Sequence, residues 1–561
     1  MKYKTYLFLS LFLFLFISTS NIFGQSYWMQ RAGGLTPDAG SDISTDAAGN
    51  TYTTGYFTST AAFGSFSLSS AGVTDIFITK LNSQGIYQWA VSAGGAGSDR
   101  GLSIKADAAG NSYITGYFYG TATFGGQTVT SAGIQDVFIA KYNTAGVLQW
   151  VKSAGGSNSD IGNGINVDNA GNVFVTGEFS GTATFGSFTL TSLNNSIDVF
   201  TTKLDANGNF LWAKKGSGTF TDRGLDIACD AAGNAYVTGQ FTDTITFDVP
   251  HYNTQYNAIF IVKYNSAGQE QWFRMIGGGS MNIAYGIAAD ANSNVYLTGD
   301  FTGNLIFFGP PNVTLTNPHI NKIFVAKYDN AGNLLWTHAD GSDNFITSKN
   351  ITVDASGNPY IVGDFKCKFD DYAAQYGQGT FNSVGFLDIY ATGYNTSGVW
   401  QWSRQCGGKQ DDDGAGIAVN TTGNVTITGS FNKTLMFPSA SNFIGYNYFD
   451  IYGGGTYCNT SNYYYYHGFN SAGNTDIFIA QNFDITQPTY DYYARNGAGC
   501  NRPYVGVCIN NTTAFLNCPD TVTFCNVGSI DAVSNTYPMG PDFTYLWSTN
   551  ATSNSLSIHS T

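Results

Sequence analysis

Charged residues are scarce in this sequence, at 11% of 561 residues, whereas an average soluble protein has about 25%. Basic residues are the scarcer sign: 24 lysines and arginines stand against 38 aspartates and glutamates, so the formal net charge is −14. Proteins that bind nucleic acid present a basic face to the phosphate backbone. The sequence therefore predicts no nucleic acid partner.

The motifs of common enzyme sites are also missing. There are five histidines, and none forms a zinc-protease helix motif. No phosphate-binding loop, dinucleotide fingerprint or Gly-x-Ser-x-Gly elbow occurs. Acidic pairs of the kind a glycosidase uses are plentiful, but nothing marks one of them. No catalytic residue is predicted.

The chain is rich instead in tyrosine, phenylalanine and glycine, with 36, 42 and 68 residues respectively. Aromatic and β-branched residues punctuated by glycine and asparagine favour strands over helices. A hydrophobic content of 43% is enough to bury a large core and excludes intrinsic disorder. The composition predicts an all-β protein.

Residues 1–24 have the pattern of a signal peptide. Lys2 and Lys4 precede an apolar run from Tyr6 to Ile17, which is too short to span a bilayer. Cleavage is expected after Gly24, and an uncleaved anchor is the alternative. No later segment is long and apolar enough to cross a membrane. We therefore expect a protein that is secreted or displayed on the outer cell surface, with no transmembrane segment after signal removal.

A repeat runs through most of the chain. A turn of the form Asp-x-x-Gly-Asn, or a close variant, recurs at intervals of 60 to 66 residues. A tryptophan lies 18 residues before every turn, an isoleucine three before it and a glycine nine after it. The seven turns start at Asp46, Asp107, Asp168, Asp230, Asp290, Asp354 and Asn420.

Each repeat has four strand-like segments. In the second repeat they are residues 101–104, 111–116, 136–141 and 147–153, and the two hairpin turns between them carry glycine. Repeats of this size with four antiparallel strands are typical of β-propeller blades. The sequence predicts seven blades, with the tryptophans packed on the fourth strands.

The ring is expected to close through the N-terminus. Residues 27–34 match a fourth strand, whereas the last repeat ends after its third strand, Asp476 to Ala480. The N-terminal strand can complete the last blade, which would remove two exposed sheet edges. A strand at Tyr490 is the alternative partner.

The pattern Ser-Asp-x-Gly-x-Ile-x-x-Asp-x-x-Gly-Asn-x-Tyr-x-Thr-Gly resembles the SBBP β-propeller repeat of secreted Bacteroidetes proteins. The resemblance covers residues 25–483 and implies a seven-bladed propeller that is secreted or surface-displayed. In that family it also implies a link to type IX secretion through a C-terminal sorting domain, and none is recognised in this sequence. Propellers host many activities, so the resemblance implies no specific function.

The rest of the chain departs from the repeat. Residues 484–517 are expected to be a linker. Residues 518–561 resemble the first strands of a PKD-like or Ig-like module, with Phe524-Cys525 followed by Tyr545-Leu546-Trp547. A complete sandwich needs about 100 residues, so we expect the parent protein to be longer.

In an exported chain the eight cysteines permit disulfides. Cys500 and Cys508 bracket a short loop and form one candidate bridge. Cys367 and Cys406 lie in the sixth repeat and form another. The uneven spacing excludes a Cys-x-x-Cys metal cluster.

One polar position recurs eight residues before the turns, at the entry to the first strand of a repeat. It is aspartate in five repeats, asparagine in the fifth and isoleucine in the sixth. As a ring around one mouth of a central channel, these carboxylates would suit Ca²⁺; alternatively, each binds backbone amides and ties adjacent blades. No other cofactor is predicted. The five are Asp38, Asp99, Asp160, Asp222 and Asp412.

Length varies only between the second and third strands, where the seven segments have 20, 20, 21, 19, 23, 25 and 47 residues. The long seventh segment is rich in aromatics, and tyrosines on loops commonly make recognition surfaces. An additional hairpin that covers the blade edge is the alternative. The ligand-binding candidates are Tyr446, Tyr448, Tyr452, Tyr457, Tyr463, Tyr464, Tyr465, Tyr466 and His467.

Together these observations predict a monomeric propeller within a longer multidomain chain. Its expected function is a non-catalytic binding or adhesion scaffold for a surface glycan or a protein. An extracellular hydrolase or lyase that acts on polysaccharides is the alternative.

Deleting residues 440–468 tests the tyrosine-rich segment. If it carries recognition, the deletion abolishes surface binding and leaves the melting temperature nearly unchanged. Thermal unfolding and a surface-binding assay measure the two effects. A steep loss of stability with intact binding would contradict the prediction.

Overall fold

The computed structural model of the chain describes residues 28–252, 257–279, 281–316, 321–342, 345–366, 368–370, 380–383, 386–408, 410–438, 465–482, 522–525 and 555–558. The chain divides into two compact units, Met1–Gln487 and Pro488–Thr561. In the second unit, β39 (Val522–Cys525) pairs antiparallel with β40 (Ser555–Ile558). The signal peptide, the predicted linker and most of the predicted C-terminal module lie outside the described residues.

In the first unit, each repeat contributes four antiparallel strands, as predicted. The innermost strands are β2 (Ala39–Thr45), β8 (Arg100–Ala106), β12 (Ile161–Val167), β18 (Arg223–Cys229), β24 (Asn282–Ala289), β30 (Phe345–Val353) and β36 (Asp413–Val419). The second strands are β3 (Thr51–Phe57), β9 (Ser112–Phe124), β13 (Val173–Ser180), β19 (Ala235–Phe241), β25 (Val295–Phe301), β31 (Pro359–Lys366) and β37 (Val425–Pro438).

Each repeat, which is called a four-stranded unit from here on, has an outer half that is built in the same way. The third strands are β6 (Asp75–Leu81), β10 (Gln127–Tyr142), β16 (Ile197–Leu204), β22 (Ala258–Tyr264), β28 (Lys322–Tyr328), β34 (Asp388–Tyr394) and β38 (Tyr465–Gln481). The fourth strands are β7 (Tyr87–Gly95), β11 (Leu148–Gly156), β17 (Phe210–Gly216), β23 (Glu270–Gly277), β29 (Leu334–Ser342), β35 (Trp400–Cys406) and β1 (Trp28–Gly34).

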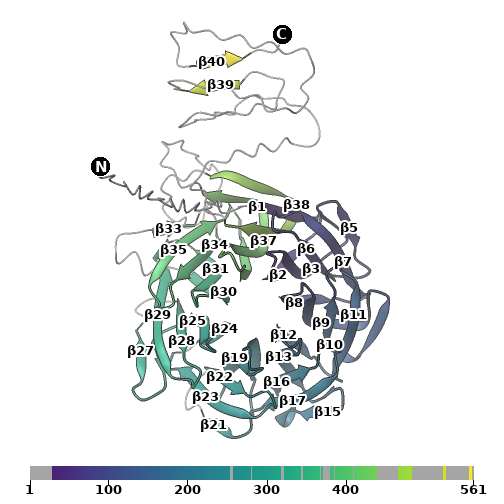
Figure 1. Cartoon of the computed structure of the whole chain (residues 1–561), viewed down its shortest axis with the longest axis vertical. Helices are drawn as coiled ribbons and strands as arrows, with labels where there is room; N and C mark the ends of the chain where they lie inside the picture. Colours follow the sequence, from purple (N-terminus) through teal and green to yellow (C-terminus); the bar gives the residue numbers. More distant parts are fainter. Residues whose placement is uncertain are drawn as a thin grey trace, which may run out of the picture. The chain divides into compact units, whose positions relative to one another are not determined.

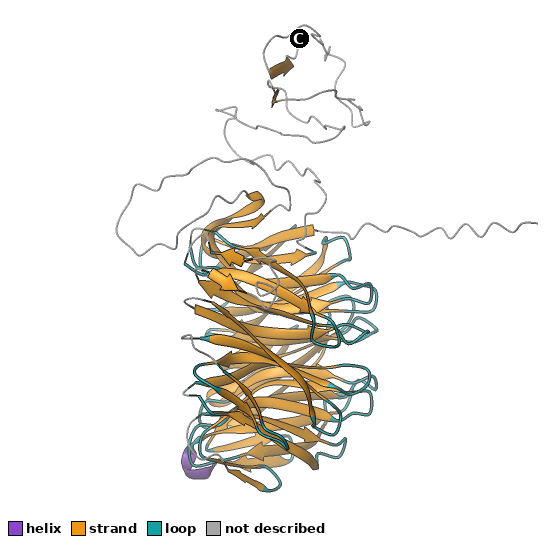
Figure 2. Cartoon of the chain, turned by 90° about the vertical axis from the view of Figure 1, so that its left-hand side faces the viewer, coloured by secondary structure: helices purple, strands orange, loops and turns teal. Residues whose placement is uncertain are grey.

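The innermost strands surround a common axis (Figure 1). Each lies against the innermost strand of the next repeat, and β36 lies against β2, so the cycle is closed. Strands dominate the described part of the chain (Figure 2), whose single helical element is the 3₁₀ turn η1 (Leu193–Asn195). The prediction of an all-β, propeller-like fold is confirmed. No helix among the described residues is long and apolar enough to cross a membrane.

The repeats do not form separate sheets. Among the described residues, backbone hydrogen bonds join the strands into six sheets of four or more strands, and the largest unites the first two repeats. The cause is the segment between second and third strands, which forms an outer hairpin. This hairpin pairs with the fourth strand of the preceding repeat, as β4 does with β1 and β14 with β11.

Some outer hairpins are continuous with longer strands, as in β9 with β10 and in β37 with β38. The others are β4 (Thr60–Phe63) with β5 (Phe66–Ser69), β14 (Thr182–Phe185) with β15 (Phe188–Thr191), β20 (Thr244–Thr246) with β21 (Pro250–Tyr252), β26 (Leu305–Phe307) with β27 (Val313–Leu315), and β32 (Lys368–Asp370) with β33 (Thr380–Asn382).

The N-terminal strand completes the last repeat, as predicted. β1 pairs antiparallel with β38, from Trp28 opposite Gln481 to Ala32 opposite Ile477. Its other edge is covered by β4, so neither edge of β1 is left open at that end.

The recurring glycine is required by close packing within each unit. The first strand bulges between Gly40 and Asp42, which presses the carbonyl of Ala39 onto Gly55 of the second strand. A Cβ atom at Gly55 would lie 2.0 Å from that carbonyl oxygen and 2.8 Å from the ring of Phe77. Only glycine fits such an approach.

The recurring tryptophan joins consecutive units. Trp89 lies on the fourth strand of one unit, and its indole N–H donates to the carbonyl of Thr144 in the outer turn of the next, at 3.1 Å. In the same turn Gly146 has φ +76° and lies so close that a Cβ would sit 2.8 Å from the indole. Trp28, Trp150, Trp212, Trp272 and Trp336 donate to the following unit in the same way.

The candidate bridge between Cys367 and Cys406 is wrong, because Cys406 is buried as a free thiol. It belongs to the apolar core between the last two repeats. Cys500 and Cys508 lie outside the described residues, and that pairing stays a prediction.

Replacing Trp89 with alanine should lower the free energy of unfolding by about 3–5 kcal/mol, because a large buried ring is lost. Trp89→Phe should cost less, since the ring remains and one hydrogen bond, worth about 1 kcal/mol, is removed. Chemical denaturation measures both changes. The control is Gln88→Ala, an exposed neighbour. A Trp89→Ala variant as stable as the parent would show that the contact does not hold the units together.

Candidate functional site

The five recurring aspartates lie in the links between a fourth strand and the next innermost strand. Their exposure is 0–1%, so they do not line an open channel mouth as expected. Asp99 shows the arrangement: its Oδ2 accepts from the amide of Gly95 at 2.7 Å and its Oδ1 from that of Tyr119 at 2.8 Å. Its own N–H donates to the carbonyl of Thr74 at 2.8 Å. The side chain thus ties two adjacent units together.

A second aspartate, at the start of the preceding unit's third strand, faces each of the five. The sequence analysis missed it, although its position was visible as the Asp before the Ile-Phe or Val-Phe pair. At the other two junctions both partners are replaced, by Asn282 with Ala258 and by Ile346 with Lys322. The pairs are Asp38–Asp476, Asp99–Asp75, Asp160–Asp136, Asp222–Asp198 and Asp412–Asp388.

The paired carboxyls are enclosed and held close together. Burial raises the pKa of Asp99 to about 6; the amides of Tyr119 and Gly95 oppose the rise and the carboxylate of Asp75 adds to it. Burial likewise raises the pKa of Asp222 and of Asp412 to about 8. Oδ1 of Asp75 is buried without a hydrogen-bond partner.

The surroundings of each pair are backbone N–H groups, which repel cations. A calcium site needs six to eight oxygen ligands. Within the described residues, no group of three or more His, Cys, Asp or Glu side chains could hold a metal ion. The arrangement accounts for the carboxylates as ties between units, which was the alternative interpretation of the sequence.

The junction pairs should make stability depend on pH. In unfolded chains aspartate titrates near pH 4, whereas Asp99 and Asp412 titrate near 6 and 8 in the folded protein. The folded state therefore binds more protons in this window, and the free energy of unfolding falls as pH rises from about 4 to about 8. We expect a higher melting temperature at pH 5 than at pH 8.5.

The matched variant is the double substitution Asp75→Ala with Asp99→Asn, which copies the natural Ala258 and Asn282 junction. It should reduce the dependence of melting temperature on pH. The control is Asp205→Asn, a turn residue whose pKa is lowered by hydrogen bonds from Asn209, so it stays ionised across the window. Equal melting temperatures at both pH values in the parent would rule out the titration of the pairs.

The side chains that vary between repeats lie where the innermost strands begin and the second strands end. We call these seven cross-strand pairs the inner rim. Each pair follows directly on the invariant glycine, yet no two pairs are alike. They are Ala39–Tyr56, Arg100–Tyr117, Ile161–Glu178, Arg223–Gln240, Ile283–Asp300, Thr347–Asp364 and Asp413–Ser430.

Charged side chains of the inner rim contact the neighbouring unit. Arg223 forms an ion pair with Glu178 at 2.8 Å. Lys349 lies 3.6 Å from both Asp364 and Asp413. Burial lowers the pKa of Lys349, but the two carboxylates outweigh burial and the net pKa is raised. Burial, with the nearby carboxylate of Asp413, raises the pKa of Asp364.

Deeper along the axis, a polar cluster joins units that are not adjacent. Asp42 of β2 accepts from the hydroxyl of Ser103 on β8 at 2.8 Å and from the amide side chain of Asn350 on β30 at 3.1 Å. Asn350 and Asp42 lie two units apart around the ring. Burial raises the pKa of Asp226, on the same level, to about 7. The cluster bridges the axis below the inner rim.

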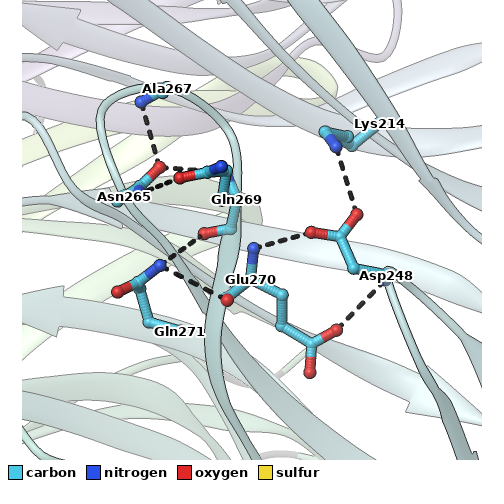
Figure 3. A network of polar contacts seen from close by, with 7 residues as sticks. All are labelled: Lys214, Asp248, Asn265, Ala267, Gln269, Glu270 and Gln271. Carbon is cyan, nitrogen blue, oxygen red and sulfur yellow. Dashed lines mark hydrogen bonds and ion pairs between the residues drawn. The ribbon is translucent and has the colours of Figure 1, made fainter.

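The outer edge holds a further polar network, between the third and fourth repeats (Figure 3). Lys214 contacts Asp248 at 3.1 Å, and Asp248 and Glu270 exchange hydrogen bonds between side chain and backbone. Nε2–H of His251 donates to Glu270 at 2.8 Å, and the imidazole stacks on Phe273 with ring centroids 3.7 Å apart. Because these groups satisfy one another, the network joins the repeats at their outer edge.

The tyrosine-rich segment falls mostly outside the described residues, which include none of Tyr446 to Tyr464. Tyr465, Tyr466 and His467 lie on β38, where Tyr465 is paired with Pro438 and His467 with Phe437 of β37. The two strands that enclose the segment are therefore paired at its base. The proposed role of its tyrosines stays a prediction.

Comparison with known proteins supports the repeat architecture. The beta-propeller repeat model SBBP matches residues 149–178 and 271–306. An uncharacterized WD repeat-containing protein of Acanthamoeba polyphaga mimivirus is 27% identical over 431 residues, which covers 63% of this chain and 31% of that protein. The chain thus spans about a third of the length of this curated relative.

A solved structure is also similar in part. It is a protein of unknown function from Bacteroides caccae, with a TM-score of 0.30 and 11% identity. The match covers 58% of this chain and 98% of that one.

Proposed function

We propose that this protein is a secreted or surface-displayed, non-catalytic scaffold, a seven-bladed ring that binds a glycan or a protein partner at the inner rim. The observation that carries the proposal is the contrast between invariant and variable positions. Positions that packing determines are the same in all seven repeats, such as the glycine next to the inner rim. The neighbouring inner-rim pairs differ in every repeat, so packing does not determine them.

The loops around the inner rim add an apolar contribution on the same face. These loops lead into the first and third strands, and together with the nearby part of β10 they carry large apolar side chains that are about half exposed or more. Exposed apolar residues surrounded by polar ones mark interaction surfaces. The exposed apolar residues on this face are Leu35, Val73, Ile134, Phe220, Met281 and Phe386.

The topology assigns these loops and the inner rim to one face. Val73 donates its N–H to the carbonyl of Gly97, in the link that leads to β8. The hairpins between third and fourth strands lie at the opposite ends of the strands, and they carry Ile86 and Val147. A partner that approaches along the axis from the inner-rim side would meet charged, aromatic and apolar groups together.

The proposal is tested by binding of the labelled full-length chain to a panel of immobilised polysaccharides and extracellular proteins. The variant Val73→Ser, Ile134→Ser and Phe386→Ser changes the inner-rim face. We expect it to lose at least tenfold in affinity for whichever probe the parent binds, with a melting temperature within about 2 °C.

The control changes the opposite face by Ile86→Ser, Val147→Ser and Leu211→Ser, at residues 59%, 57% and 46% exposed. Val73, Ile134 and Phe386 are 67%, 58% and 54% exposed, so the two sets are matched. Binding lost in the control and kept in the inner-rim variant would place the interaction elsewhere. A parent chain that binds no probe while it cleaves one would refute a non-catalytic role.

A polysaccharide-active enzyme is the second candidate, and the Lys349 cluster favours it. Carboxyls with raised pKa in a shared site are typical of general acids. Asp364 has such a pKa, and the exposed Asp413 approaches the same lysine. Release of reducing ends from the same polysaccharides, abolished by Asp413→Asn, would establish this alternative.

A further inference from the structure

Arg100 and Arg223 occupy the same position in two repeats, and the difference between their surroundings points to a ligand. Each follows a junction aspartate and precedes Gly-Leu. Each begins an innermost strand and faces the residue after the invariant glycine of the preceding unit. For Arg223 that residue is Glu178, and for Arg100 it is Tyr56.

Arg223 has its counter-charge inside the protein. Its guanidinium forms an ion pair with Glu178 at 2.8 Å. At the equivalent place Tyr56 supplies a ring instead, and the guanidinium carbon of Arg100 lies 4.1 Å from the ring centroid. Such cation–π stacking leaves the in-plane N–H groups free to donate.

The described residues provide no acceptor for those donors. They include no hydrogen bond or ion pair to the guanidinium of Arg100, whereas Arg223, whose Nε is equally buried, has the carboxylate of Glu178 at 2.8 Å. The two Nη groups of Arg100 are not among the buried unpartnered atoms. An external carboxylate would pair with them, because the planar guanidinium matches a carboxylate in two parallel hydrogen bonds.

Two further tyrosines complete the cluster. Tyr117 is the cross-strand partner of Arg100. Its ring lies edge-to-face with that of Tyr119, with centroids 6.1 Å apart and planes at 81°. All four side chains are half-buried. Tyrosine rings offer flat apolar faces with polar hydroxyl tips, and the C–H face of a sugar ring packs on such a face while its hydroxyls meet the tips.

We propose that Tyr56, Arg100, Tyr117 and Tyr119 form a binding site for a carboxylate-bearing saccharide, a uronic acid. This inference rests on the proposed function and names the ligand of one sector of the inner rim. The carboxylate pairs with Arg100, and the sugar ring packs against the tyrosines. In a chain with a net charge of −14, one half-buried cation among aromatic rings suits one acidic sugar rather than a highly charged polyanion.

The probe is trigalacturonic acid, titrated into the full-length chain by calorimetry, with its fully methyl-esterified form as the matched neutral ligand. We expect esterification to weaken binding at least tenfold. Arg100→Gln should have the same effect.

The sharpest variant is Tyr56→Glu, which copies the natural Glu178–Arg223 pair. It should preserve the fold, because the chain already contains that pair, and should abolish binding by neutralising Arg100 from within. The control is Lys214→Gln, which removes one positive charge at the outer edge and should change the affinity less than twofold.

Equal binding of the esterified and free-acid forms would overturn the inference, as would full binding by Tyr56→Glu or Arg100→Gln. A parent chain that binds tetraglutamate more tightly than trigalacturonate would overturn the saccharide assignment. If trigalacturonate does not bind but the parent still binds the immobilised panel through the inner-rim face, this inference fails and the proposed function stands.

Discussion

The contact between consecutive units is the constraint on which the whole ring depends. A four-stranded unit is short and twisted, and it has no separate core large enough to be stable alone. Each unit is therefore stabilised by two kinds of contact with the next unit, and both kinds recur with the repeat. An indole N–H, such as that of Trp89, reaches the outer turn of the following unit, and a buried aspartate such as Asp99 ties the strand ends on the other face.

The outer hairpins also join neighbouring repeats. Because β4 pairs with β1 and β14 pairs with β11, hydrogen bonds run from one repeat into the preceding one. This covers fourth strands that would otherwise be free edges. It also explains why length varies only in this segment: a hairpin outside the ring can lengthen without moving any innermost strand.

The sequence predicted the features that follow from strict spacing. Tryptophan and glycine recur because each makes an equivalent close contact in most units, and the spacing of the recurring residues predicted the four strands and the closure by β1. The outer hairpins and the second junction aspartate were missed, because β-pairing across repeats depends on which backbone edges become neighbours in space. The inner rim was missed for the opposite reason. Its residues do not recur, so a search for periodicity passes over Tyr56, Glu178 and Asp364.

The same contrast separates structure from recognition in this protein. Where an aspartate is repeated with its partner, as in Asp99 with Asp75, both disappear together at the two junctions that lack them, which is the behaviour of a packing unit. The position of Arg100 and Arg223 differs from this pattern. Arginine is present in both repeats, but the residue that it faces is tyrosine in one and glutamate in the other. A structural arginine would keep its counter-charge in both units. The loss of that counter-charge at Tyr56, in a ring whose other contacts are reproduced so closely, indicates that this arginine is held for a group that the chain does not supply.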